Sequence, residues 1–93
     1  MSSTFKNIWV CYLLECADGT LYCGITTDLD KRLAAHNAGT AAKYTRARGP
    51  VAPVLVETCT DKSAALKREM EIKGLTRTEK LELIRLTATP ENP

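Results

Sequence analysis

The sequence has few of the features that mark membrane, secreted or metal-binding proteins. Its 93 residues include one His and four Cys, and the cysteines form no Cys-x-x-Cys pair. The longest uncharged apolar run, at 8–14, is much shorter than a membrane helix, which needs about 20 residues. No long apolar stretch follows the N-terminus, so we expect no signal peptide. We therefore expect a cytoplasmic protein whose cysteines pack in the core, with structural zinc or a disulfide as less favoured alternatives.

Acidic residues are absent from a long stretch in the middle of the chain. Between Asp30 and Glu57 every Lys, Arg, Asp or Glu is a cation. A field of one sign attracts polyanions, and phosphate contacts supply most non-specific affinity for nucleic acid. A solvated loop is the alternative, but a tyrosine and a threonine lie among the cations. This interleaving favours contacts with the sugar-phosphate backbone of a nucleic acid. The predicted contact residues are Lys31, Lys43, Tyr44, Thr45, Arg46 and Arg48.

The order of apolar runs and turns predicts one small α+β domain. Strand-forming residues occupy 8–16, 20–25 and 54–60, and an Asp-Gly turn joins the first two runs. Caps and apolar spacing predict helices at about 28–38, 63–74 and 76–86, with a long loop at 39–53. We expect a three-stranded, mostly antiparallel sheet flanked by about three helices, in the order β-β-α-β-α-α. This domain would span 8–86, between an N-terminal segment at 1–7 and a flexible tail at 87–93.

Two tyrosines are predicted to lie close together on the first two strands. Side chains alternate along a strand, so pairing across the Asp-Gly turn would make Tyr12 and Tyr22 near neighbours. Gly24, within the second strand, indicates a bulge or a close approach of another group to the backbone. Strand tyrosines more often pack than react, so packing is the structural alternative.

Three charged or titratable residues lie on predicted helices. Arg32 and His36 are one turn apart on a half-apolar face, where an arginine more often lies along the surface than binds phosphate. Glu69 is expected on the inward face of its helix, beside Leu66 and Met70. An inward carboxylate needs a partner, which a salt bridge or a divalent cation would provide.

These residues make the chain similar to the GIY-YIG nuclease superfamily, in particular its small stand-alone bacterial YhbQ-like branch. Its two signature motifs correspond to Val10-Cys11-Tyr12 and Tyr22-Cys23-Gly24, with the tyrosines ten positions apart. The helix pattern of the family includes Arg32 and His36, and its metal-binding glutamate corresponds to Glu69. The resemblance spans about 9–86. The sequence departs from the family at a lysine after the second motif, replaced by Ile25, and at a late asparagine without a counterpart.

The resemblance implies metal-dependent hydrolysis of DNA phosphodiester bonds. Glu69 would hold one weakly bound Mg²⁺ or Mn²⁺ ion, and Arg32 would stabilise charge on the phosphate. A hydroxyl of Tyr12 or Tyr22 would position or deprotonate water, and His36 would contact phosphate or relay a proton. The family also implies little sequence specificity and a place in DNA repair or recombination. RNA is a further possible substrate, and a protein partner could supply targeting.

Other classes of function remain open at the level of sequence. The missing lysine and asparagine favour, as the main alternative, a nucleic-acid-binding module of the same fold with weak or no catalytic activity. A structural or partner-binding domain, using the hairpin edge or the last helix, is a second alternative. The sequence makes no prediction of the oligomeric state or of the preferred DNA structure.

Overall fold

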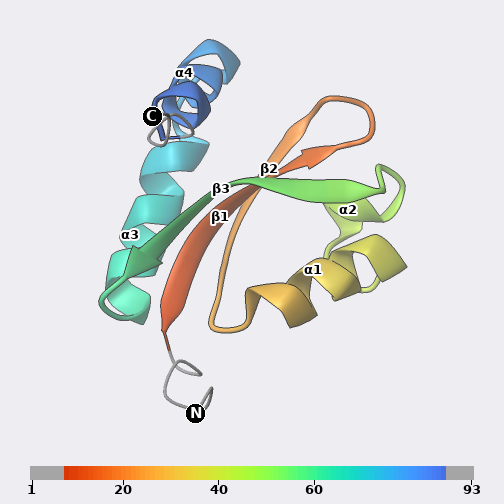
Figure 1. Cartoon of the computed structure of the whole chain (residues 1–93), viewed down its shortest axis with the longest axis horizontal. Coiled ribbons are helices and arrows are strands. Elements are labelled where there is room, and N and C mark those ends of the chain that lie inside the picture. Colours follow the sequence, from red (N-terminus) through yellow and green to blue (C-terminus); the bar gives the residue numbers. More distant parts are fainter. Residues whose placement is uncertain (1–7, 88–93) are drawn as a thin grey trace, which may run out of the picture.

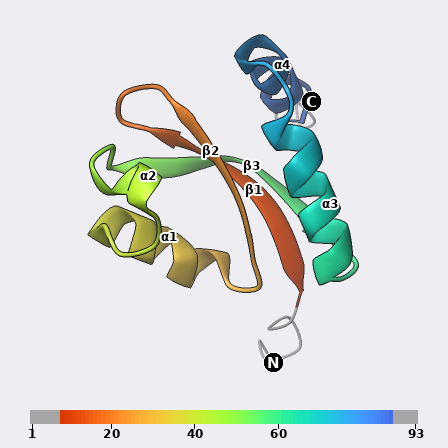
Figure 2. The same cartoon turned by 180° about the vertical axis from the view of Figure 1, so that it is seen from behind.

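A computed structural model describes residues 8–87, in which three strands form a sheet with helices on both faces. The strands are β1 (Trp9–Cys16), β2 (Leu21–Thr26) and β3 (Val51–Cys59), and the helices are α1 (Leu29–Ala38), α2 (Lys43–Arg46), α3 (Lys62–Lys73) and α4 (Arg77–Thr87). The sheet has the order β2-β1-β3, and both outer strands run antiparallel to β1. Helices α1 and α2 lie on one side of the sheet and α3 and α4 on the other (Figures 1 and 2). The predicted α+β class is confirmed.

The turn between β1 and β2 determines which residues face each other. Gly19 adopts a φ of 85°, which a residue without a Cβ tolerates. The Asp18 carboxylate accepts hydrogen bonds from the Thr20 amide and hydroxyl at 3.1 and 2.6 Å. In the resulting register Tyr12 is opposite Gly24, and Tyr22 is two residues along β2. The two tyrosines are therefore diagonal neighbours, as the turn predicted.

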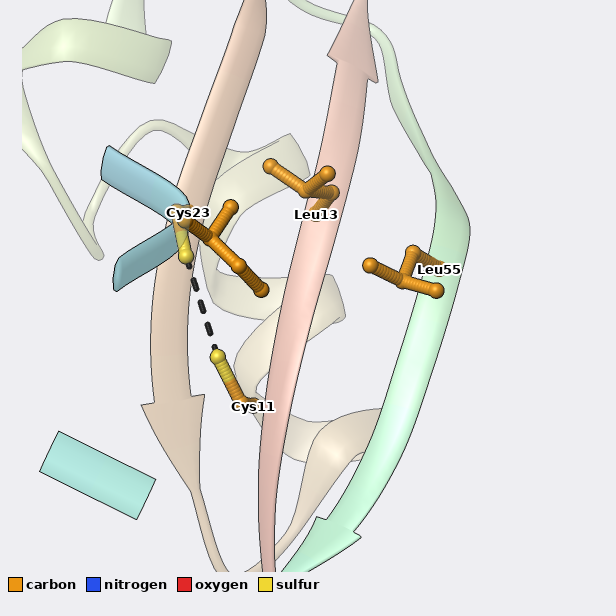
Figure 3. Close-up of a cluster of buried hydrophobic side chains, with 5 residues drawn as sticks. Cys11, Leu13, Cys23 and Leu55 are labelled. Carbon is orange, nitrogen blue, oxygen red and sulfur yellow. Dashed lines mark hydrogen bonds between the residues drawn. The ribbon is translucent and has the colours of Figure 1, made fainter. Parts of the chain in front are cut away.

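Each face of the sheet has its own apolar cluster. The face under α3 and α4 buries Cys11, Leu13, Cys23, Leu55 and Ile72 (Figure 3). The face under α1 buries Tyr12, Leu14, Cys16 and Val51. Three of the four cysteines are thus core residues, and Cys59 is half-buried. The expected packing of the cysteines is confirmed, and all four are free thiols.

The expected loop at 39–53 is wrong in two places. Residues 43–46 form the short helix α2, and β3 begins at Val51 rather than at 54. Pro53 lies within β3, which is an edge strand, where proline is tolerated. The pairing with β1 also shifts at this place, since Leu13 faces Leu55 and Leu14 faces Pro53. This irregularity leaves Val54 without a directly opposed residue.

The helices begin and end largely where their capping residues predicted. Asp28 accepts a hydrogen bond from the Lys31 amide at the start of α1, and Gly39 ends that helix with a φ of 81°. Thr76 and Glu79 form the reciprocal capping box of α4. Helix α4 includes Thr87, which was predicted to open the tail. The rest of that tail and the segment 1–7 lie outside the described residues, and no helix within 8–87 has the length and apolarity to cross a membrane.

Candidate active site

A buried chain of hydrogen bonds joins β1, α1 and α2. The Tyr12 hydroxyl lies 3.0 Å from Nε2 of His36, and Nδ1 of the same imidazole lies 2.8 Å from Oγ1 of Thr45. The Thr45 hydroxyl in turn donates to the carbonyl of Ala42 at 3.2 Å. All three side chains are almost completely buried. The sequence predicted Tyr12 and His36 as candidates, and the structure places them in direct contact.

The chain of hydrogen bonds determines which nitrogen of His36 carries a proton. A threonine hydroxyl has a single proton, and that of Thr45 is donated to Ala42. Oγ1 must therefore accept a hydrogen bond from Nδ1–H of His36. In the neutral imidazole Nε2 is then unprotonated and accepts the proton of the Tyr12 hydroxyl. The arrangement gives the Tyr12 hydroxyl a fixed hydrogen-bond acceptor.

Burial and one nearby cation keep His36 neutral. Desolvation is the main cause that lowers the pKa of His36 below its usual 6.5, and the positive charge of Arg32 lowers it further. Burial also raises the pKa of the Tyr12 hydroxyl, and the nearby Tyr22 raises it further, whereas the positive charge of Arg32 lowers it. Arg32 itself is exposed and forms no ion pair within residues 8–87. Its guanidinium is therefore available to an anion from solution.

An aromatic row continues from His36 to the surface. The Tyr22 ring contacts the His36 ring at a centroid distance of 5.2 Å and the Tyr44 ring at 5.7 Å. The guanidinium of Arg48 lies 4.2 Å from the centre of the Tyr44 ring and also pairs with Asp18. Tyr22 thus connects the buried hydrogen-bond chain with exposed aromatic and cationic groups.

Gly24 leaves the space that the Tyr12 side chain occupies. A Cβ at Gly24 would lie 2.5 Å from the Tyr12 hydroxyl oxygen and 2.7 Å from Cζ. These distances are far below van der Waals contact, so only glycine fits opposite this tyrosine. The close approach expected at Gly24 from the sequence is confirmed.

Glu69 lies on α3 and makes no direct contact with this cluster, but it is near enough that its negative charge adds to the rise in the pKa of the Tyr12 hydroxyl. Its side chain is only 17% exposed, and its carboxylate pairs with the Lys73 ammonium at 3.2 Å. No hydrogen bond or ion pair within the described part of the chain joins Glu69 to the tyrosines, Arg32 or His36. The helix face expected around it differs in detail, because Met70 is 72% exposed and Ile72 is the buried residue.

The residues predicted to bind nucleic acid divide into three groups. Lys31, Lys43 and Arg46 are exposed. Tyr44 is 39% exposed. The guanidinium of Arg48 already packs on the Tyr44 ring and pairs with the Asp18 carboxylate. The expected phosphate contact of Thr45 is contradicted, because its side chain is fully buried against His36 and has no exposed surface.

The use of Thr45 as the partner of His36 was missed by the sequence analysis. A threonine nine residues after a histidine carries no recognisable signal, because only the turn before α2 brings the two together. A second omission concerns Arg77 and Lys80, which lie beside Tyr44 although they are far from it in the chain. Two cations near the N-terminus of a helix interact unfavourably with the helix dipole, so the sequence already marked Arg77 and Lys80 as unusual.

Comparison with known proteins extends the likeness to most of the described region. The model of the GIY-YIG catalytic domain matches residues 8–82. A UPF0213 protein from Desulfotalea psychrophila is 48% identical over 83 residues, which cover 88% of this chain and 76% of the relative. A UPF0213 protein from Staphylococcus epidermidis is 52% identical over 73 residues, covering 78% and 89% of the two chains.

Two solved structures show the same fold. The solution structure of a UPF0213 protein from Bacillus halodurans matches with a TM-score of 0.59 and 42% identity, over 89% of this chain and 88% of that one. A protein from E. faecalis matches with a TM-score of 0.61 and 35% identity over 95% of both chains. With its two tyrosine motifs, its arginine and histidine helix and these relatives, the chain belongs to the GIY-YIG family of nuclease catalytic domains.

Proposed function

We propose that this protein is an endonuclease that depends on a divalent metal ion and hydrolyses DNA phosphodiester bonds with little sequence specificity. The observation that most directly supports this proposal is the 3.0 Å contact between the Tyr12 hydroxyl and Nε2 of a neutral His36. A phenol whose proton is engaged by a fixed acceptor presents its oxygen lone pairs to water in one orientation. Here the Tyr12 hydroxyl donates to His36, and its oxygen positions the attacking water.

The neighbouring groups support this chemistry. Arg32 is exposed and unpaired within residues 8–87, and it lies close enough to affect the protonation of His36 and Tyr12. An arginine in this position binds two non-bridging phosphate oxygens and stabilises the charge that develops on them. Tyr22 packs against the imidazole and holds it in place.

Glu69 is the residue that would hold the metal ion. No group of three or more His, Cys, Asp or Glu side chains gathers anywhere in residues 8–87, so a closed protein cage is excluded for that region. Mg²⁺ commonly uses one or two carboxylates together with water and substrate phosphate, and Glu69 fits such an open site. When bound there, Mg²⁺ or Mn²⁺ would act as a Lewis acid on the phosphate. Lys73 neutralises the Glu69 carboxylate until a cation replaces it.

The surroundings of the site agree with a nucleic-acid substrate in a reducing compartment. Exposed cations lie on α1 at Lys31 and on α2 at Lys43 and Arg46. Four free thiols are compatible with the cytoplasm, where we place the protein. We place its activity in DNA repair or recombination, with RNA as a second substrate to be tested.

Cleavage of DNA by a matched pair of glutamate variants tests this proposal. Supercoiled plasmid and single-stranded, duplex and branched oligonucleotides are incubated with Mg²⁺ or Mn²⁺ and with the wild type, Glu69→Gln or Glu71→Gln. Glu71 lies on the same helix and its side chain is 65% exposed, so its substitution should leave cleavage unchanged. Glu69→Gln and Arg32→Gln should each lower the rate by about 100-fold or more.

Three other outcomes would each contradict part of this proposal. Equal cutting by all variants would identify a contaminating activity. Metal-dependent cutting that Glu69→Gln retains would remove Glu69 from the mechanism. Binding of every substrate without cutting by the wild type would instead establish the nucleic-acid-binding module.

A further inference from the structure

A pocket lies at the opposite end of the aromatic row from His36. Its volume is about 210 Å³, and it is lined by Thr20 and Leu21 of the hairpin, Tyr44 of α2, and Arg77 and Lys80 of α4. Sites for drug-sized ligands are larger, at roughly 300–1,000 Å³. The pocket therefore has room for a small unit, such as one sugar with its phosphate.

The two cations of the pocket lack a counter-charge. No carboxylate in residues 8–87 pairs with Arg77 or Lys80, whereas the nearby Arg48, Lys73 and Arg85 all have acidic partners. The two side chains are three positions apart on α4, where like charges repel each other. An anion in the pocket would relieve this repulsion.

One of these cations is already held in place. Nη1 of Arg77 donates to the Gly19 carbonyl at 2.8 Å, which fixes its guanidinium against the hairpin turn. The remaining N–H groups of Arg77 stay available for a ligand. Lys80 is half-buried and brings a second positive charge to the same space. A phosphate entering the pocket would meet donors that need little ordering.

β2 connects this pocket to the candidate active site. Leu21 lines the pocket, and Gly24, three residues further along this edge strand, lies opposite Tyr12. Tyr22, between them, is on the Tyr12 side and contacts both Tyr44 of the pocket and His36 of the site. At roughly 3.3 Å per residue the separation of Leu21 from Gly24 is about 10 Å. A duplex rises about 3.4 Å per nucleotide, so the same span corresponds to about two or three nucleotides.

We propose that the strand being cut continues along β2 and that Arg77 and Lys80 bind its phosphate two or three nucleotides from the scissile bond. This inference rests on the proposed function, since it assumes that a nucleic-acid strand occupies the Tyr12 site. Recognition is through the sugar-phosphate backbone rather than through a stacked base, because Tyr22 and Arg48 already contact the Tyr44 ring. The pocket fixes the direction of the strand on the protein.

Titration of the isotope-labelled full chain with single-stranded (dT)12 in EDTA tests this path without any cleavage. Backbone amide signals of Thr20, Leu21 and Lys80 should shift with the same dissociation constant as those of Arg32 and His36. One strand would then contact both places. Shifts confined to the Arg32 and His36 region would overturn the proposal.

Charge-matched variants make the test quantitative. Lys80→Gln and Arg77→Gln should each reduce the slope of log affinity against log salt by about 0.7, the value for one lost phosphate contact on a single strand. Lys67→Gln removes the same charge from an exposed position of α3 outside the pocket and should change the slope much less. Equal slopes for Lys80→Gln and Lys67→Gln would refute the pocket contact.

A free nucleotide is the competing ligand for the same chemistry. Thymidine 5′-monophosphate, titrated separately, should shift the pocket signals far more weakly than (dT)12. Equally tight binding would make the pocket a mononucleotide site and overturn the strand path. If Lys80 governs DNA binding but the wild type does not cut, the nuclease proposal fails alone. If the wild type cuts and Lys80→Gln behaves like Lys67→Gln, the pocket proposal fails alone.

Discussion

At the scale of single residues, the protonation of His36 is the property on which the proposed chemistry depends. The imidazole is buried between Tyr12 and Thr45 and accepts one hydrogen bond while donating another. A second proton on the ring would turn Nε2 into a donor facing the Tyr12 hydroxyl. The phenol proton would then lose its acceptor, so only the neutral ring keeps the Tyr12 hydroxyl in this orientation.

The first prediction concerns this pKa, which NMR can measure because His36 is the single histidine of the chain. We expect a pKa below 6.5, and an increase in Arg32→Gln because that variant removes a repelling charge. Since the unfolded chain then takes up the proton first, His36 supports stability fully above about pH 6.5 and progressively less below it. A pKa at or above 6.5 in the wild type would contradict the neutral imidazole.

The second prediction concerns Gly24. In Gly24→Ala the new methyl group overlaps the Tyr12 ring, which its bond to His36 prevents from moving freely. Overpacking of this kind typically costs about 1–3 kcal/mol, which urea unfolding would measure. Gly74→Ala is the matched control, because its Cβ meets only ordinary contacts of 3.5 Å. Equal stability of the two variants would show that Tyr12 adapts.

At the scale of elements, the short helix α2 has an importance that its length does not suggest. Its four residues place the Thr45 hydroxyl under His36 and the Tyr44 ring beside Tyr22. Helix α2 therefore supplies the last hydrogen-bonding side chain of the buried chain and also carries part of the exposed cationic surface. A change in α2 should affect both stability and chemistry.

The third prediction separates these effects with Thr45→Val, which preserves shape and removes the hydroxyl. Nδ1–H of His36 then loses its acceptor in a buried place, which costs about 1–3 kcal/mol of unfolding free energy. We also expect slower cleavage, because the tautomer is no longer fixed. Thr58→Val on the exposed face of β3 should be neutral by both measurements. A neutral result for Thr45→Val would mean that Thr45 only fills space.

Sequence reasoning succeeded where a local pattern determines the structure. The Asp-Gly turn, the alternation of β1 and β2 and the helix caps predicted the hairpin, the neighbouring tyrosines and the close approach at Gly24. It failed where tertiary contacts decide. Pro53 is acceptable in β3 only because that strand is at an edge, and Thr45 is buried only because α2 packs under α1.

The candidate site shows the same division. Tyr12 and His36 were predicted as members of a motif, but their direct contact follows from the packing of α1 on the sheet. The pocket at Arg77 and Lys80 was not predicted, because it forms where α4 meets a hairpin nearly 60 positions earlier. No local pattern describes a juxtaposition over such a separation.

At the scale of the whole molecule, the sheet is a partition between two cores. One core carries the tyrosines and the other carries two of the buried thiols, Cys11 and Cys23. Because both cores share β1, damage to either should loosen the other. The thiols therefore report on the integrity of the whole fold, including the site on the far face.

The fourth prediction uses this property with a thiol-reactive dye. Only Cys59 is half-buried, and burial also raises its pKa, so one thiol should react slowly in the native protein. Cys11, Cys16 and Cys23 are 0–4% exposed and should react only as the protein unfolds in urea. The urea concentration at which half of these thiols have reacted should equal the concentration at which half of the circular dichroism signal is lost. Two or more fast native thiols would contradict the closed core.

The central position of β1 has a consequence for how the protein loses function on warming. β1 is hydrogen-bonded on both sides, so its amide protons should exchange with solvent only when the entire sheet opens. Tyr12 is therefore anchored in the slowest-opening element, whereas Arg32 and His36 lie on α1, whose fluctuations can be local. We expect inactivation to precede melting, with an inactive species that still keeps its sheet and recovers fully on cooling.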